Sequence, residues 1–236
     1  MKHPEKSGRP KLVVLSGAGI SAESGLRTFR GNDGYWRDHS VMQLATPQAW
    51  KTDRALVLDF YNERRRGVLA AEPNAAHKAL VDLEQAFEVV VITQNVDDLH
   101  ERAGSSHIIH LHGEIMKSRS TLDHRLVYDT GGKDILMGDR CERGSQLRPH
   151  IVWFGETVPL LGEAVKHVSD ADVFIVIGTS LSVYPAAGLV DDAPANARKF
   201  LVTLESQITD LPFVWLKETA CVGVPKIRDL LLKNST

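Results

Sequence analysis

The sequence predicts an α/β fold with a mostly parallel sheet, helices on both faces and a small insertion module. Short apolar runs of the kind found in strands buried on both faces occur at 12–15, 89–93 and 173–177. Each run stops abruptly at a polar or glycine-containing loop. Loops or helical patterns separate the runs, which is the order that builds parallel sheets.

The composition is that of a globular protein. Of the 236 residues, 43% are hydrophobic, which is ample for one large packed domain. With 28 basic and 30 acidic residues there is no overall electrostatic attraction to nucleic acid or membrane. No apolar run is long enough for a bilayer, and the first ten residues lack the core of a signal peptide. We therefore expect a cytoplasmic protein whose Cys141 and Cys221 are reduced thiols.

The first apolar run leads into a glycine turn. Gly17, Gly19 and Ala22 stand at G-x-G-x-x-A spacing. This spacing lets the backbone turn tightly and approach a diphosphate at a helix N-terminus. An ordinary dinucleotide fold then places a strand and an acidic residue about 20 residues further on. Asp38 lies at that distance but follows no strand, which argues against hydride transfer.

Two helices are predicted between the first and second strands. Residues 53–70 fit an amphipathic helix that starts at Asp53, in which Tyr61 and Arg64 are neighbours on one face. Taken alone, the basic run 64–66 is typical of a solvated helix face. Pro73 opens the second helix, over 74–86.

Polar residues follow the next two predicted strands. The strand 89–93 ends in Gln94, Asn95 and Asp97, and the strand 107–111 leads into His112. Open α/β sheets bind ligands at the carboxyl ends of their strands. Histidines also occur at 100, 107 and 110, but no cysteine or third ligand lies close in sequence, so we predict no metal site. His112 is our candidate general base, because the pKa of histidine lies near neutrality.

The rest of the chain returns to strand and helix patterns after a polar segment. Residues 116–148 are polar and irregular and indicate an insertion. The strand 173–177 ends in Gly178, Thr179 and Ser180, a second glycine and hydroxyl loop. Strands are predicted at 199–204 and 213–216, and a closing helix at 221–233.

Five separated segments together resemble one family. GAGISAESGLRTFRG, TQNVDDLHERAG, HLHGE, VWFGE and GTSLSVYPAAGL occur in the order and approximate spacing of the sirtuins, the NAD-dependent protein lysine deacylases. The resemblance runs from Lys11 to the C-terminal helix. It implies a Rossmann-like core (about 8–31, 75–115 and 150–236) and a small module built from insertions at about 32–74 and 116–149. NAD and an acyl-lysine protein or peptide would meet in the cleft between them.

The resemblance also implies roles for residues at the matching positions. The diphosphate is expected beside Ala18, Gly19 and Ser21, and again beside Gly178, Thr179 and Ser180. The nicotinamide ribose and nicotinamide are expected beside Phe29, Arg30, Gln94, Asn95 and Asp97. The residues expected to flank adenosine are Leu204, Glu205, Ala220 and Cys221. The substrate peptide is expected along a strand containing Val152, Phe154, Gly155 and Glu156.

The implied reaction is removal of acyl groups from lysine, with release of nicotinamide and O-acyl-ADP-ribose. In the family, the acyl oxygen attacks the ribose carbon as nicotinamide leaves. Asn95 and Asp97 would bind the carboxamide, and His112 would deprotonate a ribose hydroxyl. The peptide would add a strand to an exposed backbone edge, a mode that tolerates varied sequences.

Two features refine this expectation. Tyr61 and Arg64 stand where sirtuins that remove acidic acyl groups have a tyrosine and an arginine, so succinyl and malonyl groups join acetyl as expected substrates. Most sirtuins also have a four-cysteine zinc site, whereas this interval contains only Cys141. We therefore expect no zinc. Replacement packing is expected from Leu122, Leu126, Val127, Tyr128, Ile135, Leu136 and Met137, and an unorthodox metal site could use Asp123, His124, Asp139 and Cys141.

Two other functions use the same pocket. Transfer of ADP-ribose to a protein side chain needs only a different nucleophile. A catalytically idle NAD-binding sensor would result if the altered module no longer presented the peptide. The presence of His112, Asn95 and Asp97 argues against an idle site.

Overall fold

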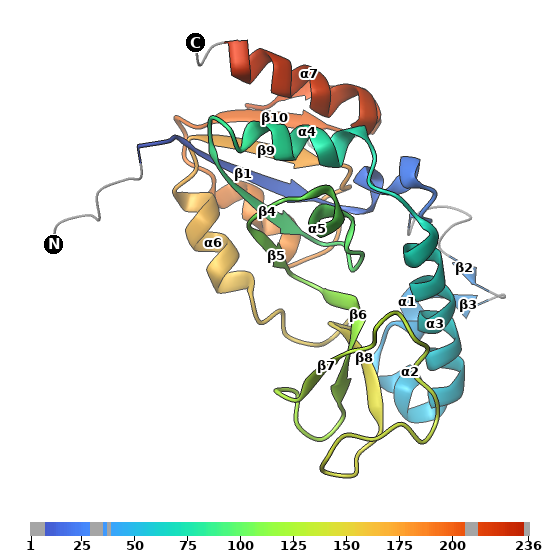
Figure 1. Ribbon diagram of the computed structural model, residues 1–236. Helices are drawn as coiled ribbons and strands as arrows, with labels where there is room; N and C mark the ends of the chain where they lie inside the picture. Colours follow the sequence, from blue (N-terminus) through green and yellow to red (C-terminus); the bar gives the residue numbers. More distant parts are fainter. Residues whose placement is uncertain (1–7, 29–34, 37–38, 206–211, 234–236) are drawn as a thin grey trace, which may run out of the picture.

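The larger part of the molecule is a six-stranded, wholly parallel sheet (Figure 1). The computed structural model describes residues 8–28, 35–36, 39–205 and 212–233. The strand order is β11-β10-β9-β1-β4-β5. The bounds are β1 Lys11–Ser16, β4 Glu88–Thr93, β5 Ile108–His110, β9 Val173–Ile177, β10 Arg198–Val202 and β11 Val214–Leu216. The predicted fold class and its buried strands are confirmed.

The alternation of side chains along β1 explains the two layers of core. Leu12 and Val14 face one cluster, whereas Val13 and Leu15 face the other. Helices α4 (Ala75–Leu83) and α7 (Ala220–Lys233) cover the first face. Helix α6 (Leu161–Ser169) and the 3₁₀ segment η4 (Ala186–Asp192) cover the second face. The central strands are therefore buried on both sides, which is why their sequence is almost continuously apolar.

The predicted helix starts agree with the caps in the structure. Asp53 accepts from Leu56 N and begins α3 (Arg54–Ala70), and Asn74 accepts from Ala76 N and begins α4. Sequence reasoning placed no helix at α5 (Leu99–Ala103), α6 or η4. Within the described residues, no helix has the length and hydropathy needed to cross a bilayer.

A smaller layer lies beyond the carboxyl edge of the sheet (Figure 1). It combines α3 with α1 (Val41–Leu44), α2 (Pro47–Thr52), the hairpin β2 (Tyr35–Trp36) and β3 (His39–Ser40), and an antiparallel sheet ordered β7-β6-β8. That sheet comprises β6 (Gly113–Ser120), β7 (Val127–Asp129) and β8 (Leu147–Ile151). Its apolar cluster includes Trp50, Phe60, Tyr61, Ile115, Ile135 and Trp153.

The predicted irregular structure of residues 116–148 was wrong, and so was part of the packing expected there. Residues 113–151 contain three strands. Their sequences are largely polar because one face of this small sheet is in contact with water, so no apolar run identified them. Of the expected replacement residues, Ile135 is buried, but Leu122, Leu136 and Met137 are more than half exposed. Polar contacts hold the segment instead. The Cys141 sulfur lies 3.4 Å from Ser120 Oγ and 3.2 Å from Ser145 Oγ.

Candidate active site

A cavity of about 310 Å³ lies where β1 and β4 end and α3 passes over them. Its lining brings together segments that are far apart in sequence. The glycine turn contributes Ala18 and Ser21, the segment after β4 contributes residues 94–97, and α3 contributes a stripe that includes Arg64. The carboxyl ends of neighbouring parallel strands meet at one edge, so the fold itself gathers these polar loops.

Ser21, Asn95 and Asp97 form a buried polar cluster at this cavity. Ser21 Oγ donates to Asp97 Oδ2 at 3.0 Å and accepts from Asn95 Nδ2 at 3.1 Å. Leu99 N donates to the other Asp97 oxygen. All three side chains are more than nine-tenths buried. Burial raises the pKa of Asp97, opposed by the bonds from Leu99 and Ser21. The Ser21 hydroxyl, expected beside the diphosphate, is thus committed to this cluster.

The His112 ring is oriented by a backbone carbonyl. Its Nδ1 lies 3.0 Å from Gln94 O, so Nδ1 carries the hydrogen and donates. The Nε2 lone pair is then available as a base, since the neutral ring has one donor and one acceptor nitrogen. Burial lowers the pKa of His112 from its usual 6.5, and the bond to Gln94 partly opposes this. His112 is therefore neutral and basic near pH 7.

The two predicted glycine loops pack directly against each other. Gly19 N donates to Gly178 O at 2.8 Å, and a Cβ on Gly19 would lie 2.6 Å from Gly178 Cα. A Cβ on Gly17 would lie 2.7 Å from Thr179 Cβ. Gly178 has φ +60° and a Cβ there would meet Ile20 N at 2.5 Å. The close packing of the two loops therefore requires glycine at positions 17, 19 and 178, independently of any ligand. Only short 3₁₀ turns follow, η1 (Ala18–Ile20) and η2 (Ala22–Ser24), rather than a long helix.

The second loop is tied to the first site by Gln94. Gln94 Nε2 donates to Thr179 Oγ1 at 3.1 Å, and Thr179 Oγ1 also accepts from Leu181 N. Ser180 Oγ lies 2.6 Å from Ser182 Oγ at the exposed rim. Loops at the ends of β4 and β9 are therefore physically connected, as the sequence interpretation required.

The residues expected around adenosine lie at the same edge of the sheet. Leu204 and Glu205 follow β10 and are exposed, whereas Ala220 is buried at the start of α7. Cys221 N donates to Glu23 Oε2 at 2.8 Å, which ties η2 to the start of α7. Phe29 and Arg30, expected over the nicotinamide ribose, and Asp38 lie outside the described residues.

Tyr61 and Arg64 project from the same face of α3, as predicted. Arg64 lines the cavity with Asn95 and Asp97, and its guanidinium lies 5.4 Å from the centre of the Phe60 ring. Tyr61 is buried and its oxygen accepts from Trp153 Nε1 at 3.1 Å. Burial raises the pKa of Tyr61 to about 12, opposed by the nearby charge of Arg64.

The solvated-face interpretation is wrong for Arg65, which is fully buried. Arg65 Nε donates to Ile115 O, and its Nη1 donates to Asn62 Oδ1. Asn62 Nδ2 donates to Ile135 O, and Asn62 Oδ1 accepts from Ile135 N. Desolvation lowers the pKa of Arg65 to about 10. Arg65 therefore links α3 to β6, and Asn62 links α3 to the segment between β7 and β8. Nothing in the run of three arginines distinguishes the buried one.

The predicted substrate strand is not a strand at residues 152–156. β8 ends at Ile151, Val152 N donates to His112 O, and the chain turns at Gly155 with φ +88°. Phe154 is exposed, at 40%. The Glu156 carboxylate is occupied by Arg148 at 2.7 Å and Arg119 at 3.1 Å. The Glu156 carboxylate therefore helps to fix this turn.

The residues considered for an unorthodox metal site point to other partners. Asp123 pairs with Arg125 and Arg143, and Asp139 accepts from Leu136 N. Within the described part of the chain, these residues and Cys141 form no group of three ligands. The hydroxyls of Ser120 and Ser145 lower the pKa of Cys141 to about 7.

Sequence reasoning missed several lining residues. Phe60, Gly67 and Val68 of α3 line the cavity, as do Trp36 and Val96. The α3 residues recur at the helical spacing that includes Arg64, so the stripe was present in the sequence as a candidate surface. Trp36 and Val96 offered no comparable pattern.

The fold and this site define a class of protein. Interlocked glycine loops at the carboxyl edge of a parallel sheet, beside a cavity lined by amide and carboxyl groups, are typical of a Rossmann-like nucleotide-binding enzyme. A sequence model described as the Sir2 family matches residues 17–185. The chain belongs to the Sir2, or sirtuin, family.

Relatives and solved structures agree with this assignment. The chain is 55% identical over 225 residues to an NAD-dependent protein deacylase of Helicobacter pylori, covering 94% of this chain and 96% of that protein. It is 48% identical over 228 residues to a protein of the same description from Bacteroides thetaiotaomicron, covering 94% and 97%. A crystal structure of a Sir2 homologue–NAD complex superposes with a TM-score of 0.88 at 37% identity, covering 97% of this chain and 92% of that chain.

Proposed function

We propose that this protein is an NAD-dependent protein-lysine deacylase. The observation that supports this most is the buried Ser21, Asn95 and Asp97 cluster, which lines one cavity and connects through Gln94 to His112. Relatives described as NAD-dependent protein deacylases cover nearly the whole chain. A structural neighbour that holds a deacetylated p53 peptide, with a TM-score of 0.78 at 30% identity, is consistent with acyl-lysine proteins as substrates.

The residues at the cavity fit the nicotinamide end of NAD. A carboxamide offers both a donor and an acceptor, and Asn95 and Asp97 provide complementary groups in a desolvated setting. A buried carboxylate such as Asp97 gains from an added donor, because burial disfavours its charge. NAD, consumed as co-substrate, supplies the ribose carbon to which the acyl oxygen becomes attached. The glycine turn at 17–19 and the loop at 178–180 are the proposed diphosphate contacts.

His112 is proposed to take a proton from a ribose hydroxyl through Nε2. The bond from Nδ1 to Gln94 O fixes the tautomer and direction of the ring. Gln94 also lines the cavity and donates through Nε2 to Thr179 Oγ1. One residue therefore contacts His112, the cavity and the loop after β9. General-base assistance of this type is typically worth about 10²- to 10⁴-fold in rate.

The test of the function uses NAD with acetyl-, succinyl- and malonyl-lysine peptides. The proposal predicts nicotinamide release that depends on the peptide and accompanies its deacylation. Nicotinamide release with labelled protein and an unchanged acyl-peptide would indicate ADP-ribose transfer. A protein that binds NAD but releases no nicotinamide with any of the three peptides would be a sensor.

The preferred acyl group is proposed to include acids such as succinyl and malonyl. Arg64 lines the cavity and offers charge-assisted, bidentate bonds to a carboxylate. The Trp153 bond uses a lone pair of Tyr61, so the hydroxyl hydrogen can be donated to the same carboxylate.

Substitution Arg64→Met tests this preference. We expect desuccinylation to fall by about 10- to 10²-fold, since a charge-assisted pair is worth about 1.5–3 kcal/mol, while deacetylation changes far less. Arg66→Met is the matched control, because Arg66 is exposed and pairs with Asp134. Equal losses of both activities in Arg64→Met would contradict an acid-selective pocket and leave the deacylase assignment intact.

A further inference from the structure

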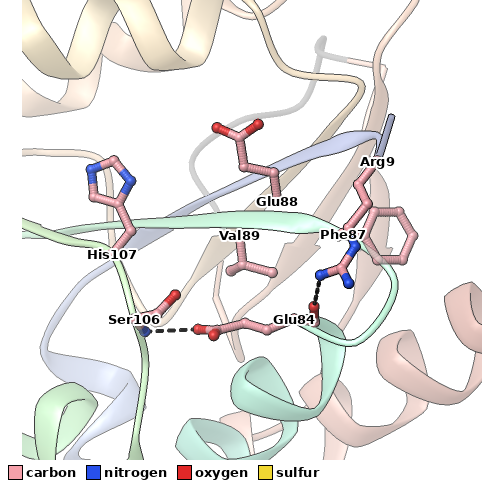
Figure 2. A pocket seen from close by; sticks show the side chains of 7 residues that line it. All are labelled: Arg9, Glu84, Phe87, Glu88, Val89, Ser106 and His107. Carbon is pink, nitrogen blue, oxygen red and sulfur yellow. Dashed lines mark hydrogen bonds between the residues drawn. The ribbon is translucent and has the colours of Figure 1, made fainter. Parts of the chain in front are cut away.

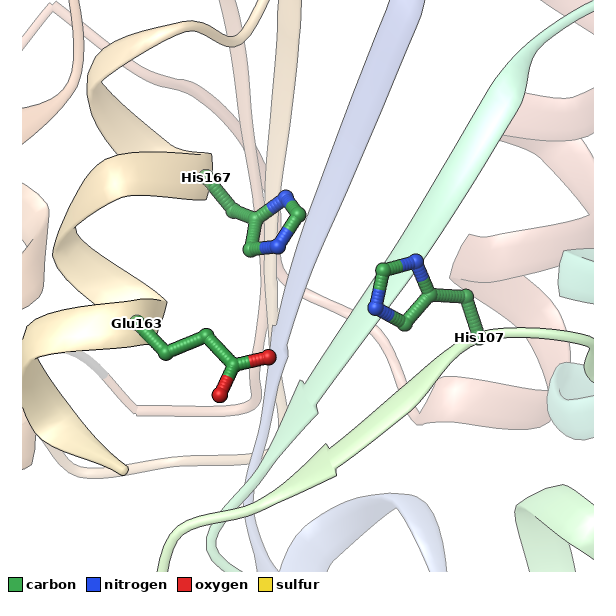
Figure 3. Close-up of side chains that lie close together, drawn as sticks. All are labelled: His107, Glu163 and His167. Atoms are coloured by element: carbon green, nitrogen blue, oxygen red, sulfur yellow. The ribbon is translucent and has the colours of Figure 1, made fainter. Parts of the chain in front are cut away.

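Three metal-ligating side chains meet at the amino edge of the large sheet, opposite the edge that holds the candidate active site. His107 immediately precedes β5, and Glu163 and His167 belong to α6 (Figure 3). Parallel strands place all their amino ends at one edge, and α6 runs back to that edge before β9 begins. Sequence reasoning found no third ligand near His107, because the other two lie much further along the chain.

The geometry of the three side chains suits a small cation. One ligand atom from each lies within 4.8 Å of the others. Glu163 and His167 are four residues apart, hence neighbours on one helix face. The His107 and His167 rings lie 5.0 Å apart and perpendicular. A tetrahedral zinc with bonds of about 2.1 Å places its ligands roughly 3.4 Å apart, so a rotation of the exposed Glu163 would close the set.

The His167 ring presents one of its two nitrogens to the cluster. Nε2 lies on the side of the Glu163 carboxylate, so it is the atom that would bind an ion (Figure 3). Nδ1 points away from Glu163 and is buried without a hydrogen-bond partner among the described residues. A neutral imidazole can bind a metal through one nitrogen while the other carries the hydrogen.

The cluster lies at the surface, because Glu163 is exposed. His107 borders a cavity of about 520 Å³ that Arg9, Glu84, Phe87, Glu88, Val89 and Ser106 also line (Figure 2). Glu88 and His107 project to the same side, away from Glu84 and Ser106 (Figure 2). Burial, followed by the charges of Lys11 and His107, lowers the pKa of His167, and the charges of Glu163 and Glu88 only partly oppose this.

We propose that His107, Glu163 and His167 form a zinc-binding site that joins α6 to the start of β5. Two imidazoles and one carboxylate are a known zinc donor set, with water completing the tetrahedron. Because the site is at the opposite edge from His112, its role is to brace the sheet rather than to take part in deacylation. This proposal is independent of the proposed function.

Titration of metal-stripped protein with Zn²⁺ by calorimetry tests the site. We expect one equivalent to bind. His107→Gln and His167→Gln should each weaken binding by more than the roughly 10- to 100-fold that loss of an outer partner costs. His124→Gln and Cys141→Ser are the controls, because they alter the small module. The thermal midpoint of each metal-free variant shows that it is folded.

The outcomes separate the alternatives. Loss of binding in the His107 and His167 variants, with both controls unchanged, supports the proposal. Failure of the wild-type protein to bind Zn²⁺ overturns it, as does equal binding by wild type and His167→Gln. Loss of binding in Cys141→Ser or His124→Gln also overturns it, by placing the ion in the small module. Co²⁺ gives a second readout, since a thiolate ligand adds an intense near-ultraviolet band that a nitrogen and oxygen site lacks.

Discussion

At the scale of single residues, His112 shows how a backbone contact sets chemistry. Its Nδ1 donates to Gln94 O, which leaves Nε2 as the base, and burial lowers its pKa. The sequence could indicate a histidine at a strand end, but not its tautomer. That property depends on the carbonyl of a residue from a neighbouring strand, and only the fold brings the two together.

The lowered pKa of His112 predicts the pH dependence of deacylation. The neutral ring is the active form, so kcat/KM rises as pH increases through this pKa and is level above it. Because the folded pKa lies below the usual 6.5, we expect the half-maximal point of the acid limb below pH 6.5. His112→Gln should lose about 10²- to 10⁴-fold in rate while still binding NAD. An acid limb centred above pH 6.5 would be inconsistent with the buried, neutral base.

Glu156 is the residue whose role the structure changes most. Its carboxylate accepts from Arg148, Arg119 and Trp153 N, and Arg148 also stacks on the Trp153 ring at 3.3 Å. The motif VWFGE indicated a peptide-binding segment. It could not indicate that the glutamate neutralises two mostly buried arginines, because those arginines lie outside the motif, in β6 and β8.

We expect Glu156→Gln to destabilise the protein by about 3 kcal/mol at pH 7, because it leaves two buried cations unpaired. Neighbouring arginines hold the Glu156 pKa below its usual 4.5 despite burial. A depressed carboxyl pKa stabilises the fold above the unfolded value, and this is lost as pH falls through the folded value. The difference between the variants in urea unfolding should therefore shrink below about pH 4.5. Glu72→Gln, at an 83% exposed side chain, is the control, and an equal loss there would argue against the buried triad.

At the scale of elements, the two glycine loops act as one unit. Gly19 and Gly178 approach so closely that neither position has room for a Cβ. The G-x-G-x-x-A spacing predicted a tight turn for phosphate binding, and the structure adds a second reason for the glycines. Loops after β1 and β9 can meet because those strands are neighbours in the sheet.

Gly19→Ala tests this interlocking. The added Cβ would lie 2.6 Å from Gly178 Cα, so one loop must move, at a cost of about 1–3 kcal/mol. We expect lower stability in urea and a smaller rise in the thermal midpoint on adding NAD. Gly162→Ala is the control, because a Cβ there meets nothing within 4 Å in a helix. Unchanged stability and NAD response in Gly19→Ala would show that the loops are not coupled.

Elements differ in how far sequence could predict them, for physical reasons. Strands β1, β4 and β9 are buried on both faces, so their apolar runs identify them without ambiguity. Helices α3 and α4 carry side-chain caps at Asp53 and Asn74. Helix α6 has no side-chain cap, and β6 ends in four successive polar residues, 117–120, so both were missed. Arg65 is buried by α3 and β6 together, a contact that no local pattern records.

At the scale of the whole molecule, residues from both layers form the candidate site. The parallel sheet supplies the loops at 17–22, 94–97 and 178–180, and α3 of the smaller layer supplies Arg64. The chain passes from the parallel sheet to the smaller layer at Gly113, which follows His112 and begins β6. Gly113 has φ +82°, and a Cβ there would lie only 2.0 Å from His150 O. The proposed base and the proposed acyl pocket therefore belong to different layers, and substrates would have to meet between them.

The most direct measurement of the central claim is the product balance of one reaction with NAD and a succinyl-lysine or acetyl-lysine peptide. Mass spectrometry would follow nicotinamide, deacylated peptide and O-acyl-ADP-ribose over time. The account predicts that the three appear in equal amounts with the wild-type protein and are nearly abolished in His112→Gln. Deacylation without NAD consumption, or nicotinamide release with no acylated ADP-ribose, would contradict it.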